Sequence, residues 1–112
     1  MKSQENFKKG AVEMVVLHLL CRRNMYGYEL VQELEKSSEG LFIIKEGTLY
    51  PSLYRMIEKK YISGSTELVG KKRTRVYYTI EEEGKKALEE MKKDYELISM
   101  GIANVLNSKS EE

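Results

Sequence analysis

The sequence predicts a mostly α-helical fold that contains one small two-stranded β hairpin and ends in a long helix. Three segments within the first 60 residues carry apolar residues at the three- and four-residue spacing of amphipathic helices. Two runs rich in Val, Ile, Thr and Tyr follow, and a glycine and three consecutive basic residues separate them. Helical spacing then returns and persists almost to the end of the 112-residue chain.

The first two helices are expected at 10–23 and 26–38. The first segment is so dense in apolar residues that its helix should be largely buried. Asn24 and Gly27 interrupt the pattern between the two helices, and Gly40 supplies a stop signal after the second. The apolar face of the first helix comprises Val12, Val15, Val16, Leu19 and Leu20. That of the second comprises Leu30, Val31 and Leu34.

The third helix is expected over EGTLYPSLYRMIEKK, residues 46–60, which contains the only proline of the chain. Proline inside a helix removes one backbone hydrogen bond and clashes with the preceding turn. If Thr48 caps the helix, Pro51 falls in the first turn, where backbone N–H groups have no partner within the helix in any case. Glu46 and Gly47 then belong to the turn before the helix. The side that faces the core is expected to consist of Leu49, Leu53, Met56 and Ile57.

The opposite side of the third helix carries groups that suit nucleic acid. Hydroxyl and guanidinium groups hydrogen-bond to phosphates and base edges, and Pro51 offers a compact apolar surface for a thymine methyl group. Two alternatives remain open: the proline only fixes the start of the helix, and the tyrosines only pack in half-buried positions. At about 100° per residue, the side chains that point away from the core are those of Thr48, Pro51, Tyr54 and Arg55.

The two β-rich runs, 61–69 and 73–80, are expected to pair as a hairpin. A winged helix-turn-helix has this order of elements: three helices and then a hairpin with a basic tip. Its third helix enters the major groove of DNA, and its two-stranded β hairpin is called the wing. A solvated turn is the alternative for the basic tip taken alone. The alternating residues of the second run are Val76, Tyr78 and Ile80. The basic residues of the tip are Lys71, Lys72 and Arg73.

The last segment, 81–106, is expected to form one helix about 39 Å long, which the rest of so small a domain cannot cover. Its apolar residues follow one another at the alternating three- and four-residue spacing of a coiled coil. A two-fold homodimer through this seam is therefore expected, and packing within the monomer is the alternative. Residues 107–112 are expected to be a disordered tail. The seam consists of Leu88, Met91, Tyr95, Ile98, Ile102 and Val105.

Composition restricts the class of protein. Hydrophobic residues make up 41% and charged residues 33% of the chain, as in a globular protein. The sequence contains neither an apolar run long enough to span a membrane nor a secretory signal, so we expect a cytoplasmic protein without a membrane partner. Residues 1–80 hold 14 basic and 9 acidic residues, whereas residues 81–112 hold 5 and 9. The net positive charge of residues 1–80 favours binding to a polyanion, and the net negative charge of residues 81–112 does not.

No pattern typical of catalysis, of cofactor binding or of a metal site occurs, so we expect neither an enzyme nor a bound cofactor. The only histidine, His18, lies beside core positions of the first helix and is interpreted as partly buried packing. The only cysteine, Cys21, excludes an intramolecular disulfide and is interpreted as a small buried hydrophobic residue.

Three motifs together resemble the PadR family of bacterial transcriptional regulators, in particular its short members with a single C-terminal helix. The motifs are YGYEL at 26–30, EGTLYPSLYRMIEKK at 46–60 and RVYYTIEEEGKKAL at 75–88, and the resemblance covers nearly all of 10–106. It implies a dimeric winged helix-turn-helix repressor that binds double-stranded DNA. Residue by residue, it places Thr48, Tyr50, Pro51 and Arg55 at the DNA surface and Lys71, Lys72, Arg73 and Arg75 in the wing.

The resemblance and the residue pattern together predict a sequence-specific regulator, a repressor acting as a homodimer on a pseudo-palindromic operator. Residues 1–80 are then the DNA-binding domain, and residues 81–106 are the dimerisation helix. Some members of the family respond to phenolic acids and others to hydrophobic drug-like compounds. A small aromatic or hydrophobic effector, if one binds, is expected to contact Met91, Tyr95 and Ile98.

The chain departs from the family pattern at three positions. Glu81 stands where the family often has a threonine that caps the last helix, so a weaker or shifted cap is expected. Lys60 stands where the family usually has glycine, at the turn into the wing. Tyr95 occupies the place of a tryptophan that lines a drug pocket in some members, which puts that type of pocket in doubt.

The alternative function is a winged helix that serves only protein–protein contact and does not bind DNA. The basic wing and Arg55 favour DNA, because a pure interaction module has no need of such a cluster.

Overall fold

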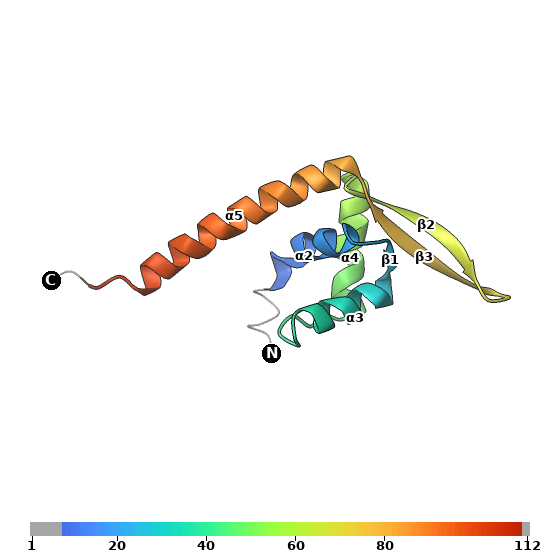
Figure 1. The fold of residues 1–112 in the computed structure, drawn as a ribbon, viewed down its shortest axis with the longest axis horizontal. Helices are drawn as coiled ribbons and strands as arrows, with labels where there is room; N and C mark the ends of the chain where they lie inside the picture. Colours follow the sequence, from blue (N-terminus) through green and yellow to red (C-terminus); the bar gives the residue numbers. More distant parts are fainter. Residues whose placement is uncertain (1–7, 111–112) are drawn as a thin grey trace.

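The computed structural model describes residues 8–110 and contains a helical body from which a hairpin and a long helix project in opposite directions (Figure 1). The start of the predicted DNA-binding domain and residues 111–112 of the predicted tail lie outside the described residues. The principal extents of 71 × 31 × 21 Å reflect the two projecting elements. In chain order the elements are α2 (Val12–Leu20), β1 (Met25–Tyr26), α3 (Gly27–Ser37), α4 (Glu46–Glu58), β2 (Ile62–Val69), β3 (Arg73–Ile80) and α5 (Glu82–Leu106).

The core lies where α2, α3 and α4 meet the base of the hairpin and the first turns of α5. The predicted apolar faces of the first two helices are largely buried there, which confirms both helices, although α2 is shorter than the expected 10–23. Leu17 and Leu30 are fully enclosed. The remaining core residues include Val12, Val16, Met25, Ile44, Leu49, Leu53, Met56, Ile62, Tyr78 and Leu88.

The sheet has three antiparallel strands in the order β1–β3–β2, so the expected two-stranded hairpin is correct but incomplete. The added strand, β1, pairs Met25 with Tyr78 and Tyr26 with Tyr77. The next residue, Gly27, is expected from the sequence only to interrupt the helical pattern. In the structure it lies against Tyr50, and a Cβ atom at this position would be 2.4 Å from the Tyr50 hydroxyl oxygen. Glycine at this position therefore leaves room for the Tyr50 hydroxyl, which a larger residue would displace.

The expected cap of α4 is wrong. The carbonyl of Lys45 accepts hydrogen bonds from the backbone N–H groups of Thr48 at 3.0 Å and Leu49 at 3.1 Å, so Lys45 is the N-cap and Thr48 lies inside the helix. Glu46 and Gly47 are likewise helical. Pro51 is consequently in the second turn, where it leaves the carbonyl four residues earlier without its helical hydrogen bond.

One member of the expected buried face of α4 is also wrong. Leu49, Leu53 and Met56 are fully buried, but Ile57 is 37% exposed. Ser52 takes the fourth buried position, and its Oγ accepts a hydrogen bond of 3.0 Å from the Arg55 guanidinium. A serine can replace an aliphatic residue here because its hydroxyl has a partner.

The turn from α4 into β2 places a lysine in a left-handed backbone conformation. The backbone N–H groups of Lys60 and Tyr61 donate to the carbonyls of Ile57 and Met56, which closes α4 with a Schellman motif. Lys60 has a φ of 64° at the position where this motif favours glycine. Glu39, with a φ of 55°, occupies the equivalent position after α3, one residue before the glycine expected to end that helix.

The last helix agrees with the predicted segment 81–106, and its start is anchored on the same turn. The backbone N–H of Glu81 donates to the carbonyl of Tyr61 at 2.8 Å. No side chain caps α5; the Glu81 carboxylate instead accepts a hydrogen bond of 2.9 Å from Ser63 Oγ. A Cβ atom at Gly84 would lie 2.1 Å from the carbonyl oxygen of Tyr61, so only glycine allows this approach of α5 to the hairpin.

Lys60→Gly is expected to raise the free energy of unfolding by about 0.5–1 kcal/mol. Glycine removes the strain of a left-handed L-residue from the folded state. The greater conformational entropy of glycine in the unfolded chain offsets only part of this stabilisation. Lys60→Ala is the matched control, since it removes the charge but keeps the Cβ atom. Urea unfolding of all three proteins at one protein concentration measures the difference. Equal stabilisation by alanine and glycine would show that charge, and not backbone conformation, is responsible.

Candidate nucleic-acid interface

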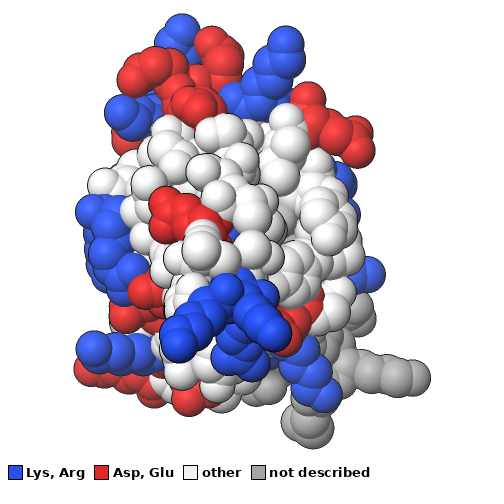
Figure 2. Space-filling view, turned by 90° about the vertical axis from the view of Figure 1, so that its right-hand side faces the viewer, with Lys and Arg blue, Asp and Glu red and all other residues white. Residues whose placement is uncertain are grey.

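The exposed side of α4 and the hairpin form one continuous face of the molecule. Figure 2 looks along the projecting hairpin and shows Lys and Arg side chains gathered at its near end, with a broad area of few charges behind them. Pro51, Tyr54 and Arg55 are exposed on α4, as expected, and Thr48 and Tyr50 are half-buried. The exposed basic residues of the hairpin tip are Lys71 and Lys72 in the turn and Arg73 at the start of β3.

A groove of about 390 Å³ separates α4 from the hairpin, and we call it the helix–hairpin groove. It brings together three of the predicted DNA-binding residues, Tyr50, Tyr54 and Arg75. The hydroxyls and the guanidinium around it are hydrogen-bond donors, and the ring faces are apolar. The other residues that line the groove are Tyr26, Gly27, Ile57, Thr74, Val76 and Tyr78.

The tyrosines of the groove have different environments. The rings of Tyr50 and Tyr54 lie with their centroids 6.3 Å apart, and the first packs against Gly27 whereas the second is exposed. Burial raises the pKa of the Tyr50 phenol, and Glu46 and Tyr54 raise it further. Burial also raises the pKa of Tyr78, with smaller contributions from Tyr50 and Tyr54. Tyr50 and Tyr78 therefore remain protonated at neutral pH and keep their hydroxyl hydrogens.

Arg55 is exposed but does not extend freely from α4. Its Nε lies 3.7 Å from a carboxylate oxygen of Glu13 on α2, and the Nζ of Lys59 lies 3.5 Å from the other oxygen. The Glu13 side chain is only 19% exposed, so two helices are joined through a partly desolvated acidic group. Glu13 is not among the predicted site residues, because its spacing among the apolar residues of the first helix is not distinctive.

Arg75 differs from the basic residues at the hairpin tip. It is half-buried, and its guanidinium carbon lies 4.2 Å from the centroid of the Tyr26 ring. Among the residues that the structure describes, Lys71, Lys72 and Arg73 make no such ring contact and no ion pair. The wing thus presents one held guanidinium on β3, two residues from Arg73, and three exposed cations at its tip that form no ion pair among the described residues.

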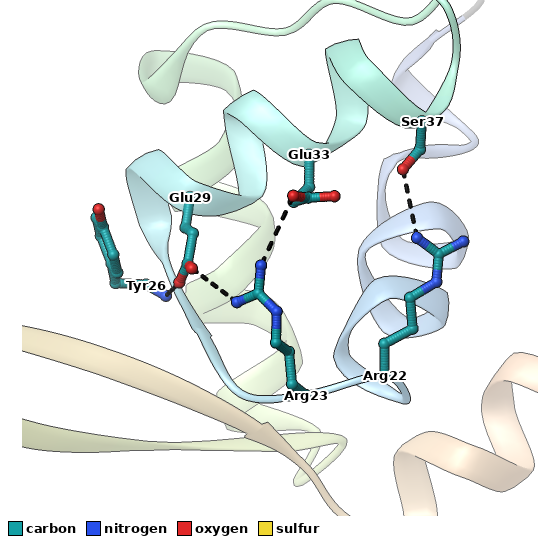
Figure 3. Close-up of polar contacts among 6 residues, drawn as sticks. All are labelled: Arg22, Arg23, Tyr26, Glu29, Glu33 and Ser37. Atoms are coloured by element: carbon teal, nitrogen blue, oxygen red, sulfur yellow. Dashed lines mark hydrogen bonds and ion pairs between the residues drawn. The ribbon is translucent and has the colours of Figure 1, made fainter.

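The start of α3 is fixed by a small polar network (Figure 3). Glu29 accepts a hydrogen bond from the backbone N–H of Tyr26 at 3.3 Å and another from Arg23 at 2.6 Å. Arg23 also pairs with Glu33 at 3.6 Å, one turn further along the helix. Arg22 reaches the end of the same helix through a hydrogen bond of 3.3 Å to Ser37 Oγ. The turn after α2 therefore holds α3 along most of its length.

Two expectations about the first helix are wrong. Cys21 and His18 are both exposed, and neither is part of the core. The helix ends at Leu20, so the cysteine lies just beyond its buried face.

Within residues 8–110, no three His, Cys, Asp or Glu side chains are grouped as metal ligands require. No helix in that range has the length and apolar character needed to cross a membrane.

The predicted seam on α5 is covered only where it meets the body. Leu88 is buried and Met91 is half-buried against the core, but Ile98 is 63% and Val105 71% exposed. Grooves of about 530 and 430 Å³ flank Tyr95, one toward His18 and Phe42 and the other toward Ala11 and Ile102. The described chain offers no cover for the outer part of the seam.

Comparison with known proteins decides the family. The model of the transcriptional regulator PadR-like family matches residues 16–90, which include α3, α4, the hairpin and the start of α5. The chain belongs to the PadR-like family of transcriptional regulators. The resemblance carried by the three sequence motifs is thereby confirmed.

Solved structures share the PadR-like fold along nearly the whole chain. A PadR-like transcriptional regulator from Bacillus cereus is 33% identical with a TM-score of 0.76, and the match covers 93% of this chain and 99% of that one. The transcriptional regulator YqjI of Escherichia coli is 31% identical over 101 residues, which are 90% of this chain but only 47% of YqjI. PadR of Bacillus subtilis, solved in complex with operator DNA, has the same fold at 22% identity and a TM-score of 0.67, over 71% of this chain and 45% of that one.

Glu13→Gln is expected to lower the free energy of unfolding by about 0.5–1.5 kcal/mol at low salt, because it leaves Arg55 and Lys59 without their partly buried partner. The loss should shrink as salt screens the cations. Glu82→Gln is the control, since Glu82 is 81% exposed and pairs only with Lys85 within its own helix. Denaturant unfolding at two salt concentrations tests the difference, and an equal effect of both substitutions would contradict it.

Proposed function

We propose that this PadR-like chain is a sequence-specific regulator that binds double-stranded DNA as a homodimer and represses transcription from a pseudo-palindromic operator in the cytoplasm. One observation carries the proposal: the helix–hairpin groove joins the exposed side of α4 to the hairpin whose tip carries Lys71, Lys72 and Arg73. A winged helix-turn-helix uses these two elements on DNA. A protein of the same fold, PadR of Bacillus subtilis, has been solved with operator DNA.

The two elements have different proposed roles. Lys71, Lys72 and Arg73 are exposed at the hairpin tip and have no ion-pair partner among residues 8–110, which suits contacts to phosphates of any sequence. Pro51 and Tyr54 are exposed on α4 and would approach the base edges, with Thr48 and Tyr50 at the rim of the same surface. Arg55 would read a base only if its guanidinium turns from Glu13 toward the groove, because its Nε now faces that carboxylate.

Dimerisation through α5 is supported by the exposed seam. Ile98, Ile102 and Val105 stand in one row on a helix that projects away from the body (Figure 1). Such a row is typical of a surface that a second copy covers, and two-fold symmetry would present two identical faces to two half-sites. The hairpin and α5 project from opposite sides of the body (Figure 1), so a partner on the outer part of the seam leaves the hairpin uncovered.

A role as an effector sensor is the second candidate function. It is favoured by the two grooves that flank Tyr95, because a small aromatic or hydrophobic molecule could enter either of them. Met91 and Ile98 line the groove toward Ala11, and together with Tyr95 they remain the proposed effector contacts.

The double substitution Lys71→Ala with Lys72→Ala is expected to weaken binding to all DNA duplexes alike, because phosphate contacts carry no sequence information. The slope of log K against log salt should become less steep by about 0.9 for each lost contact in each subunit. Lys92→Ala with Lys93→Ala, on the exposed side of α5, is the matched control and should leave the slope unchanged. Titration of mixed-sequence duplexes at several salt concentrations measures both quantities. A wild-type protein without salt-dependent binding would favour the protein–protein interaction module instead.

Ile98→Glu is expected to dissociate the dimer, because it places two carboxylates in an apolar interface. Asn104→Glu adds the same charge to the same helix away from the seam and should leave the dimer intact. Sedimentation at micromolar protein concentration gives the mass of each species. A monomeric wild-type protein, or equal dissociation by both substitutions, would rule out the predicted seam.

A further inference from the structure

The hairpin meets the helical body at a stack of three side chains. The guanidinium carbon of Arg75 lies 4.2 Å from the centroid of the Tyr26 ring, and the Tyr77 ring meets the same ring edge-on at 5.5 Å with an interplanar angle of 71°. Arg75 and Tyr77 are two residues apart on β3 and therefore share one face of the sheet. Tyr26 is the cross-strand partner of Tyr77, so its ring holds both side chains of the hairpin.

The backbone that carries the Tyr26 ring is held from the side of the body. The backbone N–H of Tyr26 donates to Glu29, whose carboxylate is held by Arg23 (Figure 3). The following residue, Gly27, is buried against Tyr50 of α4. The point from which the ring extends is therefore set by α3 and α4, and the Tyr77 ring packs against the ring itself.

Stacking leaves the hydrogen-bonding edge of Arg75 available. A guanidinium that lies over an aromatic face keeps its N–H donors in its own plane, where they can meet two oxygens of one phosphate. Arg75 lines the helix–hairpin groove, whereas the exposed tip residue Arg73 is not among the residues that line it. A free side chain such as that of Arg73 must lose rotational freedom on binding, and a stacked one has already lost much of it.

We propose that Tyr26 is a positioning residue for DNA binding, which holds the guanidinium of Arg75 in the helix–hairpin groove so that it meets a backbone phosphate in a preset orientation. The inference rests on the proposed DNA-binding function and deepens it, because it assigns to β3, two residues from Arg73, a contact that differs in kind from the contacts of the tip residues.

The test compares Arg75→Lys with Arg73→Lys, which change the same group at a stacked and at a free position. Lysine keeps the charge but lacks the planar face and the forked donors of arginine. Arg75→Lys should weaken binding to mixed-sequence duplexes about two- to fivefold, the range that a cation–π contact supports, with the salt slope unchanged. Arg73→Lys should leave both the affinity and the slope unchanged. Arg75→Ala should lower the slope by about 0.9 per subunit, because the phosphate contact itself is lost.

A double-mutant cycle then ties the effect to the ring. In a Tyr26→Leu background, Arg75→Lys should weaken binding by a smaller factor than in the wild type, whereas in a Tyr26→Phe background, which keeps the ring, it should act as in the wild type. Equal effects of the two lysine substitutions, an unchanged slope in Arg75→Ala, or the same effect of Arg75→Lys with and without the ring would overturn the proposal. The arginine variants can still overturn it if Tyr26→Leu fails to fold. A wild-type protein without salt-dependent DNA binding would instead overturn the proposed function.

Discussion

The pairing of two residues, Met25 and Tyr26, with the third strand is the contact on which the arrangement of the remaining elements depends. Met25 is almost fully buried and joins the helical core to the sheet. Tyr26 begins α3 through its backbone and holds the hairpin through its ring. Because Gly27 follows at once, α4 can approach closely enough for Tyr50 to pack there. The angle between the hairpin and α4, and hence the shape of the groove between them, is set within these three residues.

The sequence predicted the long elements well because each repeats its apolar spacing over several turns or several strand positions. The prediction from sequence was wrong or incomplete where a single local contact determines the start of a helix, the presence of a short strand or the burial of one residue. Thr48 has the chemistry of an N-cap, but the chain enters α4 three residues earlier, where the carbonyl of Lys45 accepts the first helical hydrogen bonds without a side-chain cap. A two-residue strand such as β1 has too little alternation to be seen. His18 and Cys21 were misplaced because periodicity assigns a residue to a face without showing where the helix ends or which neighbours cover it.

Charge is distributed unequally over the candidate site, and residue counts alone do not reveal it. The two cations of α4, Arg55 and Lys59, share the carboxylate of Glu13, whereas the tip of the hairpin carries three cations that form no ion pair among the described residues. The long-range attraction for a polyanion therefore comes from the wing, and the surface of α4 is closer to neutral. This division suits the proposed role of α4 in distinguishing bases. Attraction to phosphate strengthens binding to every DNA sequence equally and therefore adds affinity without specificity.

The position of α2 connects the two halves of the molecule. Glu13 holds Arg55 and Lys59 of α4, and the adjacent residue, Met14, lines both grooves that flank Tyr95 on α5. Neighbouring residues of one helix cannot shift independently, since the backbone hydrogen bonds of the helix hold them together. A molecule or a partner helix that fills those grooves therefore contacts the element that restrains the cations of α4.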